Sequence, residues 1–176
     1  MLDEERIKEA ERKVREYIES GSMKKHVFQE KILTILQNNA HDSMEIAEYL
    51  TENKKSDLWI IVTSYYSMFY IANAVLFKIG YKIGDQSPHK ITADALIVFV
   101  RNKLKKRLLE EYEEAQNEAL PQIKADTLLD EFDKERSKRG TIQYETTAIE
   151  KQAKAKTSIL RAKTFLFEME KLLESL

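Results

Sequence analysis

The chain has 176 residues, with 29 lysines and arginines against 30 aspartates and glutamates, a net charge of −1, and no cysteine. A chain of this length can build one sizeable core, and without cysteine it has no disulfide, thiolate zinc site or thiol nucleophile, which fits a reducing cytoplasm. The balanced charge excludes the global positive field of a protein that coats DNA, while a local basic patch is still compatible with it.

Four glycines and two prolines leave few turning points, so the pattern predicts long helices joined by short connections. The first predicted helix has Ile7, Ala10 and Val14 on one face and ends at residues 20–22, a Ser-Gly-Ser sequence. A second helix is predicted from Met23 to about Asn53. Its polar run at residues 37–39 either bends or interrupts it.

The third predicted helix, residues 58–79, is apolar almost all round. Ser56 is its expected N-cap, and Gly80 stands where a left-handed C-terminal cap is needed. Polar side chains such as Asn73 and Lys78 would be costly in lipid, so we interpret this segment as a buried helix rather than a membrane span. A helix of this kind lies at the centre of a bundle or in a subunit interface.

A fourth helix is predicted to begin at Ser87-Pro88, with serine as N-cap, to run toward Tyr112 and to stop before Pro121. The β-propensity of residues 97–100 is discounted, because no second strand is predicted to pair with them. A fifth helix follows over residues 123–138.

The last helix, ending at Leu176, has apolar residues from Ala155 onward at alternating steps of four and three, which is typical of a bundle seam. The predicted fold is therefore an all-α, antiparallel up-and-down bundle of four to six helices.

Three segments resemble proteins of the HEPN superfamily. Residues 64–69, Ser-Tyr-Tyr-Ser-Met-Phe, resemble the Ala-Tyr-Tyr-Ala-Met-Phe stretch of that family's central helix. Residues 80–90, which end in Ser-Pro-His-Lys, and residues 139–144, Arg-Gly-Thr-Ile-Gln-Tyr, resemble two later segments in the family's order. The resemblance implies a HEPN-like bundle over residues 37–176, with residues 1–36 as an N-terminal helical extension packing on it.

The catalytic branch of this family is a metal-independent RNase in which four to six residues lie between an arginine and a histidine. The histidine moves the proton of the 2′-hydroxyl and the guanidinium holds the phosphate. None of His26, His41 and His89 lies in that window after an arginine. The absence favours a protein that is not an enzyme, and no metal or other cofactor is predicted.

The resemblance implies that a non-catalytic member binds a nucleotide, RNA, or a partner such as a nucleotidyltransferase, in a toxin–antitoxin or RNA-associated context. Two alternatives stay open. One is an RNase with a substituted base such as His89, and the other is a purely structural or adaptor bundle.

Candidate ligand residues fall into two groups. Arg136 and Arg139 lie three residues apart and are predicted to grip a phosphate, with Tyr144 stacking on a base; a solvated helix end and a structural tyrosine are the alternatives. The second group comprises Ser87, His89 and Lys90, at a helix N-terminus that favours an anion. Ordinary capping is the alternative for that group.

Two further expectations concern surfaces. The central helix, with Trp59, Tyr65, Tyr66 and Phe69, is expected to form the core and a homodimer interface. The basic run at residues 101–107 is expected to be neutralised within its own helix by two pairs, Lys106 with Glu110 and Arg107 with Glu111, rather than to follow an RNA backbone.

Overall fold

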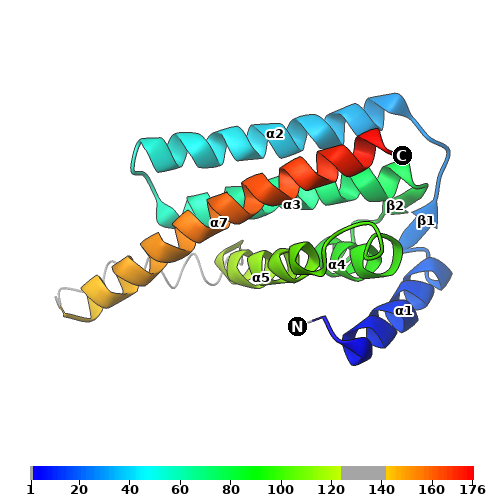
Figure 1. Cartoon of the computed structure of the whole chain (residues 1–176), viewed down its shortest axis with the longest axis horizontal. Coiled ribbons are helices and arrows are strands. Elements are labelled where there is room, and N and C mark those ends of the chain that lie inside the picture. The colour runs from blue at the N-terminus through cyan, green and yellow to red at the C-terminus, as the bar shows by residue number, and fades with distance from the viewer. Residues whose placement is uncertain (1, 124–141) are drawn as a thin grey trace.

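A computed structural model describes residues 2–123 and 142–176, with side chains from residue 150 onward in the second range. The described chain is mostly helical, with one short two-stranded ribbon, which confirms the predicted all-α bundle (Figure 1). The elements in chain order are α1 (Glu4–Glu19), β1 (Met23–Lys25), α2 (Glu30–Glu52), α3 (Asp57–Lys78), β2 (Tyr81–Ile83), α4 (Pro88–Phe99), α5 (Lys106–Ile123) and α7 (Ile142–Glu174).

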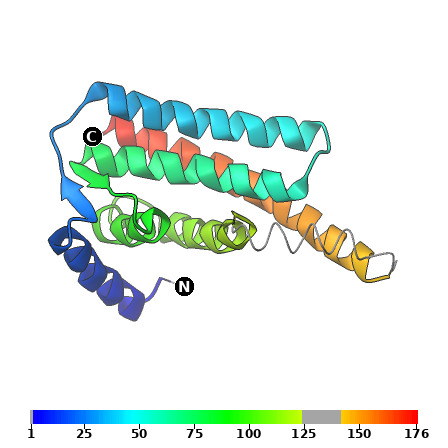
Figure 2. The ribbon, with the colours of Figure 1, turned by 180° about the vertical axis from the view of Figure 1, so that it is seen from behind.

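The apolar helix α3 is the centre of the bundle. It packs against α2 and α7 along one side and against α4 and α5 along another (Figure 2). Its residues Met68, Ile71 and Val75 are completely buried. The two expected helix ends are confirmed, because the Ser56 hydroxyl accepts a hydrogen bond from the Trp59 amide and Gly80 has φ +96°.

One 18-residue window of α3 is long and apolar enough to cross a membrane. Within this window, 72 % of the residues are buried by the rest of the chain. That burial is typical of the core helix of a bundle, so the hydropathy of α3 is weak evidence for a membrane span.

The prediction of a helix starting at Met23 was wrong. Met23, Lys24 and Lys25 form β1, which pairs antiparallel with β2 in the register Met23 to Ile83. The turn before β1 contains Gly21 at φ +74°, and α2 begins only at Glu30. The ribbon fixes the end of α1 beside the start of α4, and α2 then continues without a break through the polar run at residues 37–39 and the expected boundary at residue 36.

The fourth predicted helix is divided in two. Helix α4 ends at Phe99, and α5 begins at Lys106 and continues through Pro121, where a stop was expected. The basic run therefore lies mainly at a turn. Its two predicted ion pairs are confirmed: Arg107 Nε lies 2.7 Å from Glu111, and Lys106 Nζ lies 3.9 Å from Glu110.

Helix α1 packs against α4 through Ala10 and Val14, which are buried. Its N-terminus is capped by Asp3, whose carboxylate accepts a hydrogen bond of 2.9 Å from the Arg6 amide. The predicted N-terminal segment thus begins with a well-capped amphipathic helix that covers one side of the bundle.

Candidate functional site

The first candidate site is a cluster of aromatic rings around His89. The Tyr65 hydroxyl and His89 Nδ1 are 2.8 Å apart, and the His89 ring centroid lies 4.4 Å from that of Phe69. Tyr65 and Phe69 come from α3, whereas His89 is in the first turn of α4. Two segments that carry the family resemblance, residues 64–69 and 80–90, therefore meet in space.

The rings of this cluster differ in exposure. Tyr65 is buried, with 1 % of its surface exposed, whereas Tyr66, Phe69 and Tyr70 are only partly buried. Tyr66 stacks on Tyr70 with centroids 5.9 Å apart. The cluster thus combines a buried hydrogen-bonded tyrosine with partly exposed ring surface.

Burial controls the protonation of the cluster. It raises the pKa of Tyr65, so this phenol stays neutral near pH 7 and can donate its proton to His89 Nδ1. It lowers the pKa of His89, so the imidazole is neutral at pH 7 as well. A neutral ring that accepts from Tyr65 at Nδ1 carries its own proton at Nε2.

Of the three residues expected to form a phosphate site at α4, His89 and Lys90 face different sides of the helix. Ser87 occupies the N-cap position at φ +50°, and its side chain makes no capping hydrogen bond, so the expected serine cap is not formed. His89 contacts the rings of α3, whereas Lys90 lines a cleft on another side of α4. Pro88 at the first helical position is confirmed.

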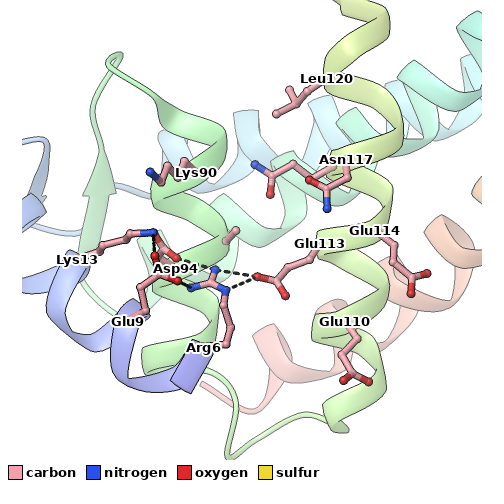
Figure 3. A pocket seen from close by; sticks show the side chains of 12 residues that line it. Arg6, Glu9, Lys13, Lys90, Asp94, Glu110, Glu113, Glu114, Asn117 and Leu120 are labelled. Carbon is pink, nitrogen blue, oxygen red and sulfur yellow. Dashed lines mark hydrogen bonds and ion pairs between the residues drawn. The ribbon is translucent and has the colours of Figure 1, made fainter. Parts of the chain in front are cut away.

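That cleft lies between α1, α4 and α5 and has a volume of about 810 Å³ (Figure 3). Its floor contains a charged network that sequence reasoning missed. Arg6 Nη2 lies 2.7 Å from Asp94 and 2.7 Å from Glu113, and the Tyr17 hydroxyl donates a hydrogen bond of 3.0 Å to Asp94. No local signal could have found this network, since its hydrogen-bonded partners are 77 and 107 residues apart in the sequence.

Arg6 keeps its positive charge in spite of its partial burial. Burial alone would lower the pKa of Arg6, but its bonds to Asp94 and Glu113 outweigh that effect and the pKa is raised. Burial also raises the pKa of Tyr17, with the negative charge of Asp94 acting in the same direction. The arginine is therefore a permanent cation between two carboxylates.

The two remaining histidines have structural contacts. His26 stacks on Phe77 with ring centroids 3.7 Å apart, and its Nε2 lies 3.0 Å from the Phe77 carbonyl oxygen. His41 Nε2 lies 2.8 Å from Glu170. Among the residues that the structure describes, no three histidine, aspartate or glutamate side chains are grouped so that they could hold a metal ion.

The other predicted ligand residues cannot be placed. Arg136 and Arg139 lie outside the described residues, and Tyr144 lies in the part of α7 whose side chains are not described. Trp59, at the start of α3, is 48 % exposed and therefore does not belong to the core, where it was expected. Comparison with known proteins adds nothing further, because no family model and no curated protein matches this sequence.

Proposed function

We propose that this chain is a non-catalytic, HEPN-like module that binds RNA or a nucleotide. The main support is the hydrogen bond of 2.8 Å between the Tyr65 hydroxyl and His89 Nδ1, which joins two of the three segments that resemble the HEPN superfamily. It holds the imidazole in the first turn of α4 beside partly exposed tyrosine and phenylalanine rings.

The chemistry of this cluster suits a nucleobase. Partly exposed rings such as Tyr66 offer a stacking surface, which in single-stranded nucleic-acid binding contributes about 1–3 kcal/mol per base. A helix N-terminus such as that of α4 favours a phosphate group. His89, with its proton at Nε2, supplies a neutral hydrogen-bond donor between these two features.

The proposal excludes cleavage by the family's route for two reasons. No histidine of the chain is separated from a preceding arginine by four to six intervening residues. In addition, His89 Nδ1 is already engaged by the Tyr65 hydroxyl, so one of the two ring nitrogens is withdrawn from proton transfer.

Binding of short fluorescent RNAs and of ATP to the purified protein tests this proposal. Tyr66→Ala removes a partly exposed ring of the cluster and is expected to weaken binding about tenfold, as for the loss of one stacked base. Tyr49→Ala, which removes a tyrosine that is 60 % exposed on α2, is the matched control and should leave affinity unchanged. Equal affinities of the two variants would contradict the assignment.

The arginine pair is tested separately. Conversion of Arg136 and Arg139 to alanine is expected to lower the affinity for RNA and ATP and to make that affinity depend less on salt concentration. An unchanged affinity would remove these residues and, with them, the adjoining Tyr144 from the proposed site.

The alternative of an RNase with His89 as base has one observation in its favour. Because burial lowers its pKa, the imidazole is unprotonated at pH 7, as a general base must be. Incubation with total RNA at neutral pH separates the two functions. We expect no cleavage, and cleavage that disappears in His89→Ala would establish the nuclease.

An adaptor role is supported by apolar side chains on α7, where Leu160 is 67 % and Phe167 55 % exposed. A partner such as a nucleotidyltransferase, or a second copy of the chain, is the proposed occupant of such a surface. Absence of RNA and ATP binding together with a stable protein complex would favour this role over nucleotide binding.

A further inference from the structure

The cleft between α1, α4 and α5 has features of a second ligand site, independent of the aromatic cluster. With about 810 Å³ it is large enough for a small organic molecule. Figure 3 shows Lys90 on one wall, Asn117 on the opposite wall and the Arg6 network beneath them. The site described above uses a different side of α4.

The charge of the lining favours a cation. Three basic and five acidic side chains line the cleft, a net charge of −2. Two of the basic residues are committed, since Arg6 pairs with Asp94 and Glu113, and Lys13 pairs with Glu9. The third, Lys90, is exposed and has no ion pair with the residues that the structure describes.

The wall formed by α5 presents oxygen atoms that are still free to accept hydrogen bonds. Glu110 uses its Oε1 atom in the contacts with the Leu2 amide and Lys106, and Glu113 uses its Oε1 atom in the contact with Arg6. The second carboxylate oxygen of each has no partner among the described residues. Asn117 lies one turn beyond Glu113. These acceptors follow the helix axis at intervals of about one turn, or about 5.4 Å.

A buried amide points independently to a ligand. Gln116 lines the cleft with 9 % of its surface exposed, and its side chain makes no hydrogen bond within the described part of the chain. Its carbonyl oxygen is thus available to accept a hydrogen bond from a ligand that carries N–H donors.

We propose that this cleft binds a linear aliphatic polyamine. Ammonium groups separated by three or four carbons match acceptors spaced by one helical turn, and they donate to Glu110, Glu113 and the amides of Gln116 and Asn117. The flexible Lys90 ammonium competes with the ligand and swings toward solvent when the ligand enters.

Calorimetric titration of the full chain with spermidine tests the proposal with two variants that are expected to change the affinity in opposite directions. Glu113→Gln removes an acceptor and a negative charge and is expected to weaken binding about tenfold. Lys90→Gln removes the competing cation and is expected to strengthen binding about threefold to tenfold. Lys90 is exposed, so this variant folds even if Glu113→Gln does not.

Glu111→Gln is the matched control, because this acid of α5 pairs with Arg107 and does not line the cleft. If Glu111→Gln binds spermidine with the same affinity as the unchanged protein, the result supports the site. The proposal fails if spermidine gives no saturable binding, if Glu111→Gln weakens it as much as Glu113→Gln, or if Lys90→Gln weakens it. It also fails if a lysine-containing peptide binds and spermidine does not.

Discussion

The Arg6 network predicts an unequal effect of its two charged partners on stability. Asp94 on α4 is 99 % buried, and Arg6 on α1 is its only cationic partner among the described residues. Arg6 is 22 % exposed and has a second acid, Glu113 on α5. Removing the arginine therefore leaves a buried charge without compensation, whereas removing the aspartate charge leaves the arginine paired.

The structure gives a magnitude for each change. Arg6→Met is expected to cost about 3–5 kcal/mol, the range for one partner removed from a buried ion pair. Asp94→Asn keeps a side chain that can accept from Tyr17 and is expected to cost about 1–2 kcal/mol. Arg12→Met on the same helix removes only an exposed pair with Glu16 and should cost less than about 1 kcal/mol.

Urea unfolding followed by circular dichroism measures the global loss, and hydrogen exchange locates it. If α1 detaches before the rest of the bundle, amides of residues 4–19 will exchange about 100-fold faster in Arg6→Met, equivalent to about 3 kcal/mol. A loss of stability in Arg6→Met no larger than that in Asp94→Asn, or than that in Arg12→Met, would contradict the assigned roles of the two charges.

Four further results are expected. Burial lowers the pKa of His89 from its usual 6.5, so between pH 6.5 and the lower folded pKa only the unfolded chain binds this proton, and the free energy of unfolding falls as the pH falls. The midpoint of urea unfolding should therefore fall less steeply with decreasing pH in His89→Gln than in the unchanged protein. An identical slope in the two proteins would contradict this expectation. Gly80→Ala should lower the free energy of unfolding by about 1–2 kcal/mol in urea titrations, because Gly80 has φ +96°; no loss would be inconsistent with that backbone conformation. Asp3→Ala should cost about 1 kcal/mol by loss of the α1 cap, measured by thermal melting, while an unchanged midpoint would show that the cap contributes nothing. The predicted homodimer should give twice the mass of one chain in light scattering at micromolar concentration, and a monomeric mass would reject it.

Local patterns predicted the helical elements well where their cause is local. The period of the apolar residues identified α3 and α7, and the caps at Ser56 and Gly80 follow from side-chain and backbone preferences within a few residues. The pairs Lys106 with Glu110 and Arg107 with Glu111 follow from helical spacing alone.

The errors arose where tertiary contacts outweigh local preference. Residues 23–25 were predicted to start a helix, yet they form strand β1, because β2, more than 50 residues later, supplies the pairing strand. The helix expected to reach Tyr112 is broken after Phe99, so that α5 can turn back along α3. Neither partner is visible in a window of local sequence.

By itself, the sequence determined the all-α class, the central apolar helix and the absence of an arginine–histidine pair at the spacing of HEPN nucleases, since each depends on residues only a few positions apart. The tertiary structure alone decided that His89 meets Tyr65 while Lys90 faces another cleft, and that Arg6 pairs with Asp94 and Glu113. Such contacts depend on how the helices pack against one another, and the periodicity of a single helix specifies which face is buried but not which side chain of another helix lies opposite it.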